Sequence, residues 1–283
     1  MKLQTFKTLW GNTLSIHDAC QEARLAKFDG IEGRAPQTQH ERVLWLDALE
    51  QNHAAYIAEI VTGEDYVPNR KWSVQQHLDD LALQLENSLP LNPLFATAIA
   101  GLDAWSEEQS IEFFKQAMAL ADDKDIVISF ETHRSRSLFN PWVTQRIVEA
   151  LPQIKLTADI SHWCVVCERL MDSEIETIKA IAGNVYHIHG RVGYDQGPQV
   201  PDPAAPEYAE ALASHERIWQ LFWTQQLNQN RRITTLTPEF GPDGYCHLQP
   251  YTQQPVVDIW QVNCWMNQRL QENYNSSFLE SNV

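Results

Sequence analysis

Four residues whose side chains commonly bind metal ions each follow a run of apolar, strand-like residues. Glu131 follows 126–130, Asp159 follows 154–158, His189 follows 185–188, and Glu239 follows 233–238. Carboxylate oxygens and imidazole nitrogens together suit a divalent cation. A further histidine, His162, lies three residues beyond Asp159. The pattern predicts a metal site assembled from the ends of several strands.

The elements that would carry these residues alternate along the chain. Four earlier strand-like runs, at 6–11, 29–34, 54–61 and 94–99, bring the total to eight, and each is followed by a segment with helical spacing of apolar residues. Eight alternating strand–helix units over 283 residues predict a closed (β/α)8 TIM barrel. We expect one barrel domain over residues 1–272 and a disordered tail over 273–283.

Helix-start signals agree with this order of elements. Ser15, Ser73 and Ser106 have the residue type and position of N-caps, and Asn140 precedes a proline at the first helical position. A further helix is expected to start at 172–174.

In a TIM barrel the carboxyl ends of the strands form the active-site face. Glu131, Asp159, His189 and Glu239 come from four consecutive strands, so we expect them to converge. Three carboxylates a few ångströms apart would strongly raise one another's pKa, and a bound cation removes that conflict. The ligands fit one divalent ion, with Mn, Co, Mg and Zn all open. His187 faces the same way as His189 in a strand and is the alternative ligand.

Composition narrows the class of protein. The hydrophobic content of 43% supports a sizeable core, and the net charge of −16 disfavours nucleic acid and anionic membranes as partners. No apolar run is long enough for a membrane helix, and the first residues lack a signal-peptide pattern, so we expect a cytoplasmic protein. The CxxC pair, Cys164 and Cys167, is expected to place two thiols on one helix turn rather than to bind zinc. Homo-oligomer formation is left open.

The motifs DGIE at 29–32, FE at 130–131, DISH at 159–162, HIH at 187–189 and PE at 238–239 resemble those of the xylose isomerase-like TIM-barrel superfamily, in its sugar (phosphate) isomerase/epimerase branch. The resemblance implies that Glu131, Asp159, His189 and Glu239 bind one metal ion. It also implies that His162 faces the substrate or supports a ligand. In the epimerases of this branch the two liganding glutamates exchange protons with the substrate from opposite faces, which would assign that role to Glu131 and Glu239.

Two positions depart from the ketose epimerases in this branch. Ser137 stands where they have a further glutamate, and Asp195 stands where they have an arginine, with Arg191 the nearest arginine. A polar loop at 190–206 also lengthens the interval between His189 and Glu239. These differences argue against a free ketose as the substrate.

A metal ion that holds a ketone and an adjacent hydroxyl acidifies the C–H they share. We therefore expect an isomerase or epimerase that acts on a small sugar, sugar acid or sugar phosphate through an enediolate, with His162 or Arg191 stabilising the oxyanion. The alternatives are a dehydratase using the same site, an apurinic endonuclease IV-like phosphodiesterase, and a barrel that binds without turnover. Trp10, Trp105 and Trp163, each near a strand end, either wall the pocket or pack between the barrel and its helices. The basic segment His133, Arg134 and Arg136 either binds an anion or is an exposed turn.

Overall fold

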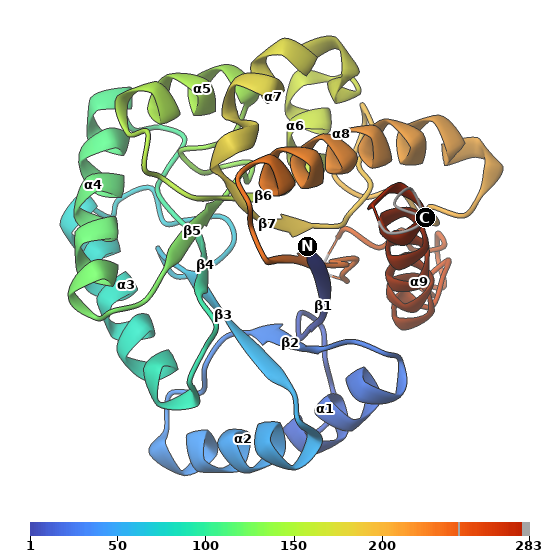
Figure 1. The fold of residues 1–283 in the computed structure, drawn as a ribbon, viewed down its shortest axis with the longest axis horizontal. Coiled ribbons are helices and arrows are strands. Elements are labelled where there is room, and N and C mark those ends of the chain that lie inside the picture. The colour runs from blue at the N-terminus through green and yellow to red at the C-terminus, as the bar shows by residue number, and fades with distance from the viewer. Residues whose placement is uncertain (243, 279–283) are drawn as a thin grey trace.

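The computed structural model describes residues 1–242 and 244–278. Eight parallel strands close into one barrel in chain order, and helices surround it (Figure 1). The expected (β/α)8 TIM barrel is confirmed. The strands are β1 (Lys2–Thr8), β2 (Gly30–Gly33), β3 (Ala55–Val61), β4 (Ala96–Ile99), β5 (Ile128–Glu131), β6 (Leu156–Ala158), β7 (Val185–His189) and β8 (Ile233–Thr237). No helix in the described part of the chain is long and apolar enough to cross a membrane.

The helices begin where the capping residues predict. Ser15, Ser73, Ser106 and Asn140 each accept a backbone N–H in the first turn, and Ser73 and Ser106 form complete capping boxes. The helices are α1 (Ile16–Leu25), α2 (Gln39–Asn52), α3 (Val74–Ser88), α4 (Glu107–Asp123), α5 (Pro141–Ala150), α6 (Ser161–Cys167), α7 (Ile175–Ile181), α8 (Ala209–Asn228) and α9 (Ile259–Phe278).

Residues inside the barrel form layers. Phe6, Ile57 and Phe95 make an apolar cluster at the amino-terminal end of the barrel interior. The next layer is polar and includes Thr97, two residues after Phe95. The Thr97 hydroxyl donates to the Thr157 hydroxyl over 2.7 Å, and the Ser129 hydroxyl lies 2.6 Å from the same Thr157 oxygen. Because strand side chains alternate, the next inward positions reach the carboxyl ends of the strands. The interior therefore becomes polar toward the mouth of the barrel.

Several boundaries differ from the expected ones. The first strand covers Lys2–Thr8 rather than 6–11, because it pairs with β8 from Lys2 onward. The helix expected from 172–174 opens as a 3-10 turn, Met171–Glu174, and becomes α7 at Ile175. Helix α6 carries Cys164 and Cys167, both buried free thiols, as expected for two cysteines on one turn.

The expected disordered tail is wrong over 273–278. These residues form the last turns of α9, where Tyr274 is buried and its hydroxyl donates to the Met1 carbonyl over 2.6 Å. This contact joins the two ends of the barrel chain. Residues 279–283 of that expectation lie outside the described residues.

Candidate metal centre

Glu131, Asp159, His189 and Glu239 meet at the mouth of the barrel. One ligand atom from each lies within 4.8 Å of the others, and all four residues are buried. Glu131 and His189 are the last residues of β5 and β7, whereas Asp159 follows β6 and Glu239 lies two residues beyond β8. The structure therefore brings together the four residues that the sequence singled out.

The Nδ1 atom of His189 lies 3.1 Å from Oε2 of Glu239 and 3.5 Å from Oε2 of Glu131. Within the described residues, neither this nitrogen nor either carboxylate oxygen of Glu131 has a hydrogen-bond partner. Buried polar atoms without partners are costly. These atoms belong to a set of four ligand atoms within 4.8 Å of one another, so the donor set fits a divalent cation.

Glu32, at the end of the short strand β2, holds the other side of the His189 ring. Its Oε1 lies 2.8 Å from His189 Nε2, and its Oε2 lies 3.0 Å from His187 Nε2. The Thr237 hydroxyl also donates to Glu32. A carboxylate only accepts, so both rings donate from Nε2, and in the neutral ring of His189 the Nδ1 atom is the one left to bind a metal ion. The sequence motif contained Glu32, but its spacing gave no sign of this role.

His187 lies deeper than His189 and pairs with Glu32 and with the Thr235 hydroxyl at 2.8 Å. Glu32, His187 and His189 form a second group with metal-type geometry, and Glu131, His133 and His162 form a third. In the second group both histidines already donate to Glu32. His189 is therefore the histidine that joins Glu131, Asp159 and Glu239.

Arg191, two residues after His189, is buried and bonds to the cluster. Its guanidinium donates to Asp159 and to Nε2 of His162 over 2.7 Å, and it lies 3.5 Å from Glu239 Oε2. Its Nε donates to the Ser161 hydroxyl over 3.1 Å. Burial opposes its charge, but Asp159 and Glu239 raise the pKa of Arg191 above its usual value. The side chain is thus a fixed positive charge beside two of the four carboxylate and imidazole groups.

Electrostatics in the cluster follow from burial and crowding. Burial raises the pKa of Glu131 to about 8, with Glu239 adding to the rise and His189 opposing it. Burial also raises the pKa of Asp159, although Arg191 works against it. For His189, burial disfavours the charged ring, but Glu239, Glu32 and Glu131 raise its pKa well above the usual value. These shifts show carboxyl groups that resist ionisation together in a buried site, which a bound cation would relieve.

His162 is fully buried beneath Arg191. Its Nε2 lies 3.8 Å from Glu131 and 3.7 Å from Asp159, and its ring contacts the tilted ring of His133 with centroids 3.8 Å apart. Burial and the neighbouring His133 lower the pKa of His162 well below its usual value. The ring lies against the candidate ligands and helps to fix Arg191.

Of the three tryptophans considered as pocket walls, one lies at the mouth of the barrel and two do not. Trp10 lies at the mouth, with Arg191 over its ring at 5.5 Å and the Tyr245 ring edge-on at 4.8 Å. Trp105 instead packs on His77, and Trp163 is buried with its N–H donating to the Leu138 carbonyl, so the expectation that these two wall the pocket is wrong.

The basic segment after Glu131 is not an exposed turn. Arg136 is fully buried and donates to the carbonyls of Thr62, Gly101 and Asp65. Its guanidinium therefore ties together the loops after β3 and β4. Ser137, at the position of the further glutamate in ketose epimerases, accepts from Leu102 N–H and from the Ser110 hydroxyl. The side chains of Arg136 and Ser137 therefore stabilise the loops at the mouth of the barrel.

The loop at 190–206 is anchored close to the cluster. His215 in α8 accepts from Gly193 N–H over 3.1 Å, and its other nitrogen contacts the Ala211 carbonyl at 2.8 Å. A Cβ on Gly193 would lie 2.6 Å from the Ser161 carbonyl oxygen, so only glycine allows this approach. The anchor fixes the segment directly after Arg191.

No protein-family model matches the chain. No curated protein matches it either. Solved structures do match over nearly the whole length. D-allulose 3-epimerase from Methylomonas sp. has a TM-score of 0.66 at 13% identity and covers 96% of this chain and 98% of its own. Endonuclease IV from Thermus thermophilus has a TM-score of 0.61 at 12% identity, covering 98% and 100%. The probable 3-DHS dehydratase AsbF from Bacillus anthracis has a TM-score of 0.61 at 12% identity, covering 96% and 99%.

Proposed function

We propose that this chain, which has the fold of the xylose isomerase-like TIM-barrel superfamily, is a divalent-metal-dependent isomerase or epimerase of a small sugar-like substrate. The observation that carries the proposal is the convergence of Glu131, Asp159, His189 and Glu239, with buried atoms that lack partners among the described residues. A divalent cation held there supplies polarisation of a carbonyl and its neighbouring hydroxyl, which acidifies the C–H between them.

The chain's own groups supply the rest of the chemistry. Glu131 and Glu239 approach from strands that have β6 and β7 between them, so they reach a bound substrate from different sides. One carboxylate removes the proton from carbon and the other returns it, which inverts or relocates the centre. Arg191 places its guanidinium beside both Asp159 and Glu239, where it stabilises negative charge on a substrate oxygen. His162 positions Arg191 through Nε2.

Elemental analysis of the purified protein tests the metal, and solvent-deuterium uptake tests the proton transfer. We expect one transition metal or magnesium ion per chain, and deuterium incorporation next to the carbonyl of at least one member of a panel of ketoses, keto-glycosides and sugar acids. Glu239→Ala should abolish both. If Glu239→Ala keeps full metal content and full exchange, the assignment is wrong.

The same experiment separates the alternatives. A dehydratase begins with the same proton removal, and the lyase is identified by a product lighter by one water. An endonuclease of the endonuclease IV kind would contain about three metal ions per chain and would cleave abasic DNA. The net charge of −16 works against a DNA-binding surface.

A further inference from the structure

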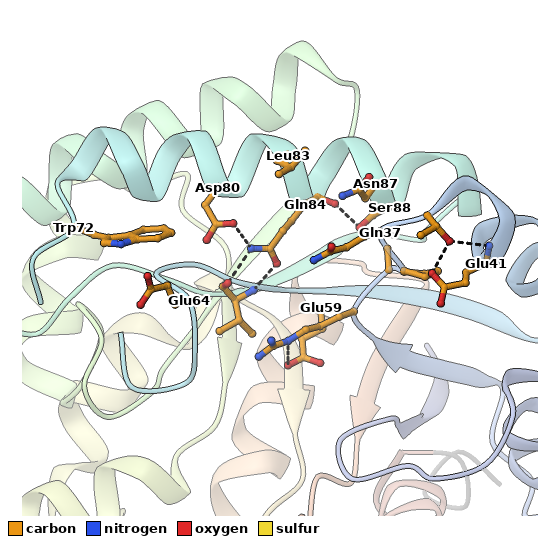
Figure 2. Close-up of a pocket in the computed structure, with 15 residues that line it drawn as sticks. Gln37, Glu41, Glu59, Glu64, Trp72, Asp80, Leu83, Gln84, Asn87 and Ser88 are labelled. Atoms are coloured by element: carbon orange, nitrogen blue, oxygen red, sulfur yellow. Dashed lines mark hydrogen bonds and ion pairs between the residues drawn. The ribbon is translucent and has the colours of Figure 1, made fainter. Parts of the chain in front are cut away.

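A cavity lies between α2, α3 and the ends of β2 and β3. It measures about 720 Å³, within the range of small-molecule sites. Figure 2 shows Asp80, Gln84 and Ser88 along the inner side of α3, with Trp72 toward one end, Glu41 toward the other and Glu59 below. We call this cavity the α2–α3 groove.

The groove is connected to the mouth of the barrel through Glu59. Side chains alternate along β3, so Glu59 faces inward like Ile57, which belongs to the inner apolar cluster. Glu59 also lines the groove. A run of ring contacts continues to the cluster: Arg34 stacks on Tyr66 at 5.0 Å, Tyr66 lies 5.7 Å from Trp10, and Arg191 lies over Trp10. Glu59 is also close enough to the candidate ligands for Glu239 and His189 to act on its pKa, which burial raises to about 7.

The side chain of Glu59 lines the groove and has few partners of its own. It is only 8% exposed, and its single ion pair, with Arg34, is loose at 3.8 Å. Within the described residues its carboxylate accepts no hydrogen bond, and the Arg34 ion pair is its one side-chain contact of this kind. A buried carboxylate accepts several hydrogen bonds, so a ligand that brings hydroxyl donors would satisfy it.

The remaining lining selects against anions. Glu41, Glu59, Glu64 and Asp80 face the groove, whereas Arg34 is the one cationic residue among its lining residues. A phosphate or carboxylate would meet repulsion there. Gln37 and Asn87 add amide groups, and the half-buried Trp72 offers an indole face. Amides, a free carboxylate and an aromatic face together suit a neutral ring that carries hydroxyls on its edge and C–H groups on its faces.

The groove is held open by its own framework. Gln84 exchanges two hydrogen bonds with the Val61 backbone, at 3.0 and 2.8 Å, and Asp80 accepts from Gly63 N–H over 3.0 Å. These contacts fix α3 against the end of β3. The cavity is therefore preformed, which lowers the free-energy cost of binding.

We propose that the α2–α3 groove is a subsite for an uncharged glycosyl unit, so that the substrate is a glycoside or disaccharide whose other sugar reaches the metal centre. This proposal rests on the proposed function, because it takes the metal centre to act on the other sugar of the substrate. It narrows the substrate class from sugar, sugar acid or sugar phosphate to a neutral two-unit carbohydrate.

Binding is tested by calorimetry on chelator-treated protein with cellobiose, maltose, lactose and sucrose, and with glucose and glucose 6-phosphate for comparison. We expect at least one disaccharide to bind more tightly than glucose, and glucose 6-phosphate to bind more weakly than that disaccharide. Glu59→Gln and Trp72→Ala should each weaken disaccharide binding about tenfold, the loss of one charge-assisted hydrogen bond or one stacking contact. Matched controls are Glu112→Gln and Trp142→Ala, both distant from the groove, which should bind as the parent protein does.

The proposal is overturned if no disaccharide binds more tightly than glucose, if both groove variants bind like the parent, or if glucose 6-phosphate binds best. Trp72 is half-buried, so its variant answers the question even where Glu59→Gln fails to fold. Because the assay needs neither metal nor turnover, disaccharide binding without deuterium exchange would reject the proposed function and keep the subsite. Deuterium exchange without disaccharide binding in the groove would keep the proposed function and reject the subsite.

Discussion

His189 and Glu32 lie 2.8 Å apart through Nε2 and Oε1, and this contact turns the other ring nitrogen toward Glu131 and Glu239. A carboxylate behind a histidine fixes its tautomer and orientation and increases its basicity as a ligand. The proposed metal centre therefore depends on a residue that lies outside the set of four.

Glu32→Gln should weaken divalent-metal affinity by about 10–100-fold, the range found when such supporting groups are removed. The amide keeps the size of the side chain but can present an N–H to His189, which would favour the wrong tautomer. Competition with a fluorescent chelator measures the affinity, and circular dichroism checks the fold. Glu112→Gln, an exposed change on α4, is the control. Unchanged affinity in a folded Glu32→Gln protein would contradict this role.

Replacing Glu131 should maintain or raise the melting temperature of the metal-free protein and should abolish metal binding. Its two buried oxygens have no hydrogen-bond partner within the described residues, and burial beside Glu239 raises its pKa to about 8. Glu131→Gln replaces a carboxyl group whose ionisation the buried site opposes with a neutral amide of similar size, so we expect the metal-free variant to melt at the same temperature as the parent or higher.

Added metal should stabilise the parent by about 2.7 kcal/mol at a concentration of 100 times Kd, and should leave Glu131→Gln unchanged. Differential scanning calorimetry with and without metal gives both values. A metal-induced rise in Tm that is equal in the two proteins would exclude Glu131 as a ligand.

Arg191 should matter most when no metal is present. Its guanidinium neutralises Asp159 and lies 3.5 Å from Glu239, so Arg191→Met leaves two buried carboxylates without their cation. Breaking a buried pair in this way costs about 3–5 kcal/mol. Urea denaturation should show this loss in metal-free protein and a smaller loss in metal-loaded protein. Arg191→Lys, which keeps the charge, should lose less than Arg191→Met in the metal-free state; an equal loss would show that packing, not charge, explains the effect.

The barrel and its four candidate ligands could be predicted because both arise from local patterns. Apolar runs that end in Glu131, Asp159 and His189 identify strands and their carboxyl ends without knowledge of distant contacts. Caps such as Ser73 and Ser106 mark helix starts by hydrogen bonds within one turn.

Long-range relationships could not be predicted in this way. Glu32 meets His189 across 157 positions, and Arg136 holds a loop 74 positions away. A lone glutamate on a four-residue strand has the same local appearance whether it supports a ligand or lies in solvent. The expectation for the tail was wrong for the same reason: the helix continues past Asn273, and there Tyr274 bonds to Met1, 273 positions away.

His215 should make the protein sensitive to acid through the loop that follows Arg191. Burial lowers the pKa of His215 from 6.5 to about 4, and one of its nitrogens must accept from Gly193 N–H. Because the folded-state pKa lies below the unfolded one, the unfolded chain binds more protons between these two values. The stabilisation is therefore complete above pH 6.5 and is lost as the pH falls toward 4.

For one proton the slope approaches about 1.4 kcal/mol per pH unit. His215→Gln, whose amide oxygen can still accept from Gly193, should flatten the decline of unfolding free energy between pH 6.5 and 4, measured by urea denaturation at each pH. His40→Gln, an exposed change on α2, should leave the parent profile unchanged. If the two variants decline equally steeply, His215 is not protonated on unfolding, and the acid sensitivity comes from the other buried histidines.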